Sequence, residues 1–311
     1  MQKIRILMCP PTYYTIPAFE NADMDVHVQP DMPKAWAQWN ALYNNYQRLG
    51  FRVHLIPPHE YLHELIFTAN GAWSKFNDET GRSEAVLANF LYPVRQLEKR
   101  EYRKGLQMLG YEERDIYELP NAMTFEGQGD LLTLADVYLF TFGVRSSPDA
   151  FTHIERLLRV KRPIVPLRLT GNKFYHGDTC IFSLRYKNAL VYYPGAFDDT
   201  SLGKLRGLDK IKFEVSESLA NHSVCNSVYI DDIVFLNIDF VDYSPHSFER
   251  SARGLFLEKE EVRYEEMMAH DQGYGEVLQF LWGLGFGIIP VYTSEYKKSG
   301  AGARCLTLFL D

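Results

Sequence analysis

Cys305 stands in a segment whose composition suits a nucleophile. Residues 299–305 read Ser-Gly-Ala-Gly-Ala-Arg-Cys, and an apolar stretch typical of a strand follows them. Glycines let the backbone bend, so that a substrate can approach the sulfur closely. A lone cysteine is more often a buried structural thiol, and that interpretation suits the other three cysteines. These are Cys9, Cys180 and Cys225, which lie among apolar residues.

A second segment offers a histidine and an aspartate two residues apart. Residues 175–180 read Tyr-His-Gly-Asp-Thr-Cys, which places His176 and Asp178 where a strand is expected to begin. Side chains two apart point to the same face of a strand. We therefore expect both groups to face one pocket, where His176 would act as the base for a thiol.

Two more segments carry polar groups next to glycines. Residues 125–130 read Phe-Glu-Gly-Gln-Gly-Asp and contain the carboxylates Glu126 and Asp130, and residues 67–71 place Asn70 before a glycine. Each of the four segments, taken alone, is more often an ordinary turn than a catalytic site. Together they supply a thiol, a base, a carboxylate to orient the base, and acceptors for a cation.

Three repeats of a helix, a glycine and a strand indicate which elements position these groups. In each repeat a leucine, a glycine and an aromatic residue end an apolar helical stretch and lead into a strand closed by proline. The repeats are Leu49-Gly50-Phe51, Leu109-Gly110-Tyr111 and Leu284-Gly285-Phe286. The glycine suits the left-handed position after a helix. The repeats favour an architecture of β/α modules, although glycine ends helices in many α/β proteins.

The remaining elements follow from periodicity. Trp36, Trp39, Tyr43 and Tyr46 give one apolar helix face, and further helices are expected near residues 92–109 and 149–158. The N-terminal stretch 1–11 is expected to form the first buried strand, which two prolines stop. Further strands are expected near residues 53–56, 116–119, 137–142, 180–184, 189–193, 233–238, 288–289 and 306–310. The charge-rich region 239–275 is interpreted as a partly helical surface insertion in a single catalytic domain spanning residues 1–311. A solvated charge run explains its composition most simply.

The composition narrows the class of protein. Of the 311 residues, 46% are hydrophobic and 23% charged, which is ordinary for a globular protein with a sizeable core. The net charge of −7 argues against nucleic acid or an anionic membrane as a partner and suits a small cationic substrate. No apolar run is long enough for a membrane helix or a signal peptide. The scattered cysteines form no C-x-x-C pair, so we expect a reducing, cytoplasmic setting.

Taken in order, the four segments resemble the motifs of the guanidine-modifying superfamily. This superfamily contains arginine deiminases, dimethylarginine dimethylaminohydrolases and amidinotransferases, and the chain looks most like the arginine dihydrolase module of cyanobacterial arginine-degrading enzymes. The resemblance covers residues 5–237 and 285–308. It implies an α/β fold, the pentein fold, in which ββαβ modules form a pseudo-fivefold propeller around a central pocket.

The resemblance also implies a catalytic role for each matching residue. Cys305 would attack the guanidinium carbon, and His176 would remove and return protons. Glu126 would orient His176, while Asp178 and Asn70 would hold the guanidinium nitrogens. No metal or organic cofactor is implied.

Four further positions match substrate-binding or pocket residues of the family. Arg95 and Arg145 would grip the substrate α-carboxylate, and Asn21 matches an asparagine of the substrate loop. Asp130 would be a further pocket acid or a structural acid. Two departures from the family pattern, Gly177 after His176 and Ala22 after Asn21, indicate a differently shaped pocket wall.

The sequence therefore predicts an arginine dihydrolase that converts arginine to ornithine, ammonia and CO2. The alternatives are an arginine deiminase that stops at citrulline and an amidinotransferase that passes the intermediate to an amine. A partner-binding protein on an inactive enzyme scaffold is a further alternative, which the joint presence of Cys305, His176, Glu126 and Asp178 disfavours. Homo-oligomerisation stays open.

Overall fold

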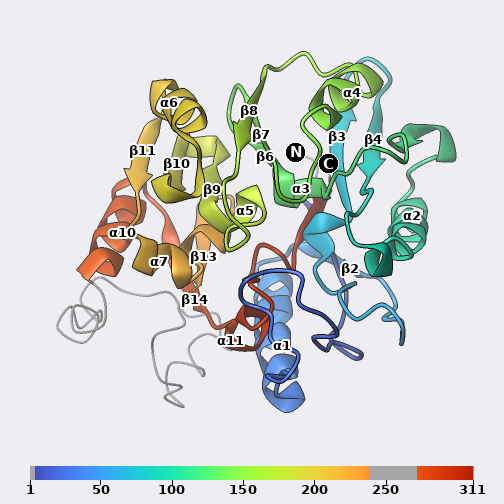
Figure 1. The fold of residues 1–311 in the computed structure, drawn as a ribbon, viewed down its shortest axis with the longest axis horizontal. Helices are drawn as coiled ribbons and strands as arrows, with labels where there is room; N and C mark the ends of the chain where they lie inside the picture. Colours follow the sequence, from blue (N-terminus) through green and yellow to red (C-terminus); the bar gives the residue numbers. More distant parts are fainter. Residues whose placement is uncertain (1–3, 238–271, 311) are drawn as a thin grey trace.

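The computed structural model describes residues 4–237 and 272–310, in which five three-stranded sheets surround a common centre (Figure 1). The first sheet combines β15 (Leu308–Leu310), β1 (Arg5–Met8) and β2 (Arg52–Leu55). The second sheet contains β3 (Ala72–Asn77), β4 (Arg82–Leu87) and β5 (Ile116–Tyr117). The third contains β6 (Leu131–Thr133), β7 (Tyr138–Phe142) and β8 (Ile164–Arg168). The fourth contains β9 (Ile181–Leu184), β10 (Ala189–Tyr192) and β11 (Ile211–Glu214). The fifth contains β12 (Val228–Ile230), β13 (Ile233–Asn237) and β14 (Gly287–Val291).

Every sheet follows the same topology. Its first two strands pair antiparallel, and a helix then crosses over to a third strand that pairs parallel with the second. The ring closes where the last strand joins the first, with Leu7 opposite Leu308. The predicted pseudo-fivefold propeller of ββαβ modules is thereby confirmed.

The crossover helices lie on the outside of the ring (Figure 1). They are α1 (Met32–Arg48), α2 (Glu98–Met108), α4 (Ala150–Leu157), α6 (Asp199–Gly207) and α10 (Gln272–Gly283). Helix α1 begins after Asp31, whose side chain accepts a hydrogen bond from the backbone N–H of Lys34. On its predicted apolar face Trp39 and Tyr46 are buried, which anchors the helix against the sheet.

The glycine repeats mark three of the five modules. Gly50, Gly110 and Gly285 have φ angles of 82°, 88° and 85°, which is the left-handed conformation expected after a helix. After α4 the left-handed residue is Arg159, with φ of 47°. After α6 the chain passes directly into an extended conformation at Leu208. The sequence pattern missed these two modules because neither has the leucine–glycine–aromatic step: Arg159 stands at the glycine position after α4, and Gly207, the last residue of α6, is followed by Leu208.

Most predicted elements are present, with shifts at their ends. The stretch 92–109 begins with a short 3-10 turn, η2 (Pro93–Arg95), before α2, and 149–158 forms α4. The placement of His176 and Asp178 on one strand is wrong, because residues 177–180 form a helical turn, α5 (Gly177–Cys180), and β9 begins only at Ile181. The predicted insertion 239–275 lies largely outside the described residues and stays a prediction, although Tyr274 is buried within α10.

One edge strand of each sheet lies nearest the centre of the ring, and we call these five the innermost strands: β3, β6, β9, β12 and β15. Each of them follows a short turn or a glycine-rich segment near the centre. These are η1 (Thr68–Asn70), α3 (Gly127–Asp130), α5, η6 (Val224–Asn226) and the segment that ends at Cys305. The four sequence motifs occupy four of these five places, so the module architecture brings them together. Within residues 4–237 and 272–310, no helix is long and apolar enough to cross a membrane.

Candidate active site

Cys305 is buried, with 2% of its surface exposed, just before β15. Its Sγ atom donates to Asp178 Oδ2 at 3.6 Å and accepts a hydrogen bond from Asn226 Nδ2 at 3.1 Å. Burial and the neighbouring carboxylate raise the pKa of the Cys305 thiol well above its ordinary value. The thiol is therefore neutral near pH 7 unless a cation stabilises its charge.

His176 is held between Glu126 and Asn70. Its Nε2 lies 2.8 Å from Glu126 Oε2, and its Nδ1 lies 3.4 Å from Asn70 Nδ2. An ionised carboxylate only accepts hydrogen bonds and an amide nitrogen only donates them. The network thus assigns the proton of neutral His176 to Nε2 and leaves Nδ1 as the acceptor, the state required of a base.

Glu126 is completely buried beside its partners. Burial favours its neutral form, but the charge of Arg145 and the hydrogen bond from His176 outweigh it and hold the pKa of Glu126 below its ordinary value. Glu126 is therefore ionised and stabilises the cationic form of His176 whenever His176 takes up a proton. The structure places it where the sequence predicted an orienting carboxylate.

Two glycines of the Glu126 motif are required by close packing. At Gly127, φ is +56° and a Cβ atom would lie 2.7 Å from the backbone oxygen of Asn70. At Gly129, a Cβ atom would lie 2.5 Å from Asn70 Nδ2 and 3.3 Å from the His176 ring. Any side chain there would displace the pair, so the glycines allow Asn70 and His176 to meet.

Arg95 fixes the orientation of Asn70. Its NH1 donates to Asn70 Oδ1 at 3.4 Å, and a guanidinium has only donors, so the amide nitrogen must face His176. Its Nε and NH2 donate to the two carboxylate oxygens of Glu98 at 2.9 and 3.0 Å. Arg95 is thus largely occupied by protein groups.

Arg145 lies on the other side of Glu126, with NH1 3.4 Å from Glu126 Oε2. Its NH2 donates to the backbone oxygen of Glu20 at 3.1 Å. The guanidinium carbon lies 4.5 and 4.8 Å from the ring centres of Tyr92 and Tyr175. Its Nε is buried and has no hydrogen-bond partner within the described residues, so this arginine retains an unused donor.

Carboxylates outnumber arginines around Arg95 and Arg145. Glu64 Oε2 lies 3.7 Å from Arg95 Nε, and Glu20 Oε2 lies 3.8 Å from Arg145 NH1. Burial and the charge of Glu64 raise the pKa of Glu20 to about 8, and burial raises the pKa of Glu98 to about 7. This excess of buried acceptors suits a cationic ligand.

Asp178 has an acceptor that no protein group uses. The residue is 1% exposed, and its Oδ1 has no hydrogen-bond partner in the described part of the chain. Burial raises its pKa. An unmatched buried carboxylate oxygen beside the nucleophile is a ready acceptor for a guanidinium N–H.

Asp130 and Asn21 lie at the edge of the site. Asp130 Oδ1 accepts from Thr141 Oγ1 at 2.7 Å and its Oδ2 from Ser146 Oγ at 2.6 Å, so protein groups bind both of its oxygens. Burial raises its pKa to about 6. Asn21 Nδ2 donates to the backbone oxygen of Ser299 at 3.1 Å and so ties its loop to the nucleophile segment.

Seven of the nine predicted residues thus lie in one continuous series of contacts. They are Cys305, Asp178, His176, Glu126, Asn70, Arg95 and Arg145. Cys305 and His176 make no direct hydrogen bond to each other in the described structure, and Asp178 interacts electrostatically with both. Motif reasoning missed Asn226, the donor to Cys305 Sγ. Among the described residues, no cluster of three His, Cys, Asp or Glu side chains could hold a metal ion.

No protein-family model matches the chain. The chain is 30% identical over 311 residues to the bifunctional arginine dihydrolase/ornithine cyclodeaminase AgrE of Nostoc sp., covering 98% of this chain and 38% of that protein. It is 33% identical over 204 residues to the N(G),N(G)-dimethylarginine dimethylaminohydrolase of Mycobacterium tuberculosis, covering 66% of this chain and 63% of that protein. The chain therefore spans less than two thirds of either relative.

Among solved structures, the chain is similar to the N-terminal domain of ArgZ bound to its product. That protein is an arginine dihydrolase from the ornithine–ammonia cycle in cyanobacteria. The TM-score is 0.77 at 27% identity, and the match covers 99% of this chain and 97% of that domain. The similarity thus extends over one complete domain of the relative.

Proposed function

Because the chain belongs to the guanidine-modifying superfamily, we propose that it hydrolyses the guanidinium group of free arginine to ornithine, ammonia and CO2. The observation that carries this proposal is the convergence of Cys305, Asp178, His176 and Glu126 in one buried site. The domain similar to this chain in AgrE and ArgZ belongs to enzymes named as arginine dihydrolases. No step of the proposed reaction requires a metal or an organic cofactor.

The substrate itself would activate the nucleophile. In the free protein the Cys305 thiol is neutral, because burial and Asp178 oppose its ionisation. A guanidinium that donates to Asp178 Oδ1 brings a positive charge next to the sulfur and offsets both effects. The thiolate would then form only when its target is bound.

The first half of the reaction releases ammonia. Cys305 Sγ forms a bond to the guanidinium carbon while His176 Nδ1 accepts the thiol proton. His176 returns a proton to the departing nitrogen, which leaves as ammonia and gives a covalent S-alkyl thiouronium. Glu126 stabilises the transient His176 cation. Water, deprotonated by His176, then adds to the same carbon and the bond to Cys305 breaks, which yields citrulline.

The second half of the reaction requires that citrulline stay bound, and a hydrogen bond from Asn70 would hold it. Arginine plus water gives citrulline plus ammonia, and citrulline plus water gives ornithine, ammonia and CO2. The ureido oxygen of citrulline needs a hydrogen-bond donor, which a carboxylate lacks and an amide has. Since Arg95 turns the Asn70 amide nitrogen toward His176, that donor faces the place where the ureido group would lie.

The α-carboxylate of arginine fits Arg145 better than Arg95. The donors of Arg95 are largely engaged by Glu98 and Asn70, whereas Arg145 has a buried Nε without a partner in the described structure. A guanidinium binds a carboxylate bidentately and so sets the position of the substrate along the site. We therefore assign the carboxylate contact to Arg145 and the positioning of Asn70 to Arg95.

A covalent trap tests the nucleophile directly. The protein would be incubated with chloroacetamidine, digested, and analysed by mass spectrometry, with and without excess arginine. The proposal predicts one adduct on Cys305 that arginine suppresses and that Cys305→Ser lacks. Labelling confined to Cys9, Cys180 or Cys225 would contradict it.

A further inference from the structure

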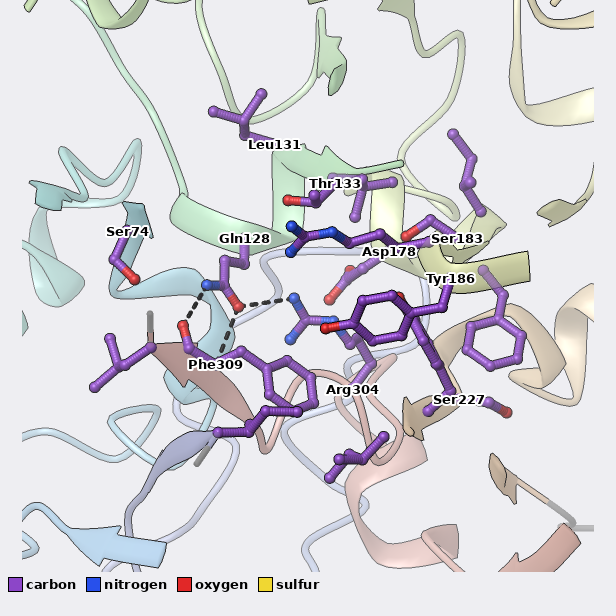
Figure 2. A pocket seen from close by; sticks show the side chains of 18 of the residues that line it. Ser74, Gln128, Leu131, Thr133, Asp178, Ser183, Tyr186, Ser227, Arg304 and Phe309 are labelled. Carbon is purple, nitrogen blue, oxygen red and sulfur yellow. Dashed lines mark hydrogen bonds between the residues drawn. The ribbon is translucent and has the colours of Figure 1, made fainter. Parts of the chain in front are cut away.

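A cavity of about 330 Å³ lies along the axis of the propeller, within the ring of innermost strands. Each of these strands contributes a lining residue, namely Ser74, Thr133, Ser183, Tyr229 and Phe309. Figure 2 shows side chains from these strands pointing into the space. The lining contains neither Cys305 nor His176, so the axial cavity is distinct from the place where the guanidinium reacts.

Two arginines line the axial cavity, and neither forms an ion pair with a carboxylate within the described residues, although Arg304 interacts electrostatically with Asp178. Arg304 donates to Gln128 Oε1 at 2.9 Å and to the backbone oxygen of Thr307, both of which are neutral (Figure 2). Arg185 lines the same space half-buried, and its guanidinium forms no hydrogen bond or ion pair within the described residues. Two partly desolvated guanidinium groups facing one space repel each other unless an anion lies between them.

The rest of the lining suits a small organic anion. Hydroxyl groups of Thr133, Ser183 and Tyr186 face the cavity and can donate to oxyanions (Figure 2), and Phe309 offers an apolar surface. Tyr186 is 59% exposed, so the cavity is reached from solvent on its side. The volume lies within the range of cavities that bind metabolites.

Asp178 is the one acidic residue among the described lining residues. Arg304 interacts electrostatically with this carboxylate and so offsets its charge within the cavity. Its Oδ2 lies 3.6 Å from Cys305 Sγ, so the axial cavity and the catalytic site share this side chain. An occupant near Arg185 would lie beside the exposed Tyr186, whose ring centre is 5.5 Å from the guanidinium carbon of Arg185.

From these observations we propose that the axial cavity binds a small carboxylate- or phosphate-bearing molecule, held by Arg185 and Arg304 at a site separate from that of arginine. The proposal does not depend on the reaction assigned to Cys305, because it rests on residues that the reaction does not use. Arg185 supplies a bidentate donor without a hydrogen-bond or ion-pair partner in residues 4–237 and 272–310, and Arg304 supplies a second guanidinium that is already oriented by Gln128.

Isothermal titration of the full chain with citrate and, separately, with pyrophosphate tests the proposal and distinguishes the two sources of oxyanion. We expect saturable binding of at least one probe, weakened roughly tenfold or more in Arg185→Gln because a charge-assisted contact is lost. Arg100→Gln, which removes an arginine whose side chain is 78% exposed, is the matched control and should bind as the wild type does. Ser183→Leu, which narrows the cavity, should also weaken binding.

Binding of citrate alone would identify a carboxylate ligand, and binding of pyrophosphate alone a phosphate ligand. The proposal is overturned if neither probe binds saturably. It is equally overturned if binding is unchanged in both Arg185→Gln and Ser183→Leu, or is lost in Arg145→Lys while both cavity variants bind normally. That last result would place the anion in the site of the substrate carboxylate.

Discussion

Asn226 Nδ2 donates a hydrogen bond to Cys305 Sγ at 3.1 Å, and the orientation of the Asn226 amide is fixed by its other contacts. Its Oδ1 accepts from the backbone N–H groups of Gly302 and Cys305 at 2.8 and 3.2 Å. Its Nδ2 also donates to the backbone oxygen of Asp178 at 3.0 Å. Because backbone N–H groups require an acceptor, the amide nitrogen must face the sulfur. Asn226 thus orients the Cys305 sulfur and, in the proposed reaction, would stabilise its thiolate.

Asn226→Asp should lower kcat and leave KM for arginine little changed. The carboxylate can still accept from the two backbone N–H groups, but its second oxygen faces Sγ without a proton to donate and repels the thiolate. A lost hydrogen bond to a charged group costs about 1.5–3 kcal/mol, which corresponds to roughly a ten- to hundredfold decrease in kcat.

The pH dependence of Cys305 alkylation by iodoacetamide separates this role from a structural one. In Asn226→Asp the rise in rate should shift to higher pH, whereas Asn121→Asp, an exposed asparagine changed in the same way, should match the wild type. A folded Asn226→Asp protein with normal kcat and an unshifted alkylation profile would contradict the positioning role.

The alkylation profile of the unmodified protein is itself a prediction. Burial and Asp178 raise the pKa of the Cys305 thiol, so the neutral form predominates at pH 7 and the thiolate fraction grows as the pH rises. We expect the alkylation rate of Cys305, followed by mass spectrometry, to increase about tenfold per pH unit through the neutral range. A plateau reached below pH 8 would show a low pKa in the free protein and would exclude activation by substrate.

Arg145→Lys should weaken the use of arginine far more than the use of agmatine, which lacks the α-carboxylate. Lysine keeps the charge near Glu126 but loses the bidentate donor pair. The loss is roughly ten- to a hundredfold in kcat/KM for arginine, from about 1.5–3 kcal/mol of charge-assisted hydrogen bonding. Kinetics with both substrates measure the difference. Equal losses for the two substrates would make Arg145 a structural partner of Glu126 and nothing more.

Asn70→Asp should convert the enzyme toward citrulline accumulation while the first step survives. In the variant the group that faces His176 is a carboxylate oxygen, which can accept from the guanidinium but cannot donate to the ureido oxygen. Chromatography of the products formed from arginine should show citrulline and about one ammonia per arginine consumed. Release of ornithine at the wild-type proportion from Asn70→Asp would show that this amide does not decide the second step.

The four sequence motifs come together in the structure because each occupies the same place in a repeated module. Asn70, Glu126, His176 and Cys305 all lie shortly before an innermost strand, and glycines at 127 and 129 are needed for the closest of their contacts. The order of the motifs along the chain was therefore enough to predict which residues lie together. The exact geometry did not follow, since His176 and Asp178 sit on a helical turn where a strand was expected.

The sequence did not predict Asn226 as a site residue, because its neighbours Val224 and Cys225 look like the start of a buried strand. A signal was nevertheless present, since Asn226 precedes β12 by two residues just as Asn70 precedes β3. The sequence also could not predict that protein groups occupy most of the hydrogen-bond donors of Arg95. It depends on Glu98, three residues away on the next turn, and on Glu64, which reaches Arg95 only through the fold.

The products that the wild-type protein forms from arginine test the proposed reaction most directly. Arginine, citrulline, ornithine and ammonia would be quantified over time, with Cys305→Ala as the matched control. We expect ornithine with about two ammonia molecules per arginine consumed, and no turnover by Cys305→Ala although this variant stays folded. Persistence of arginine with the wild-type protein, or equal turnover by Cys305→Ala, would contradict the assignment of this site as a cysteine-dependent arginine hydrolase.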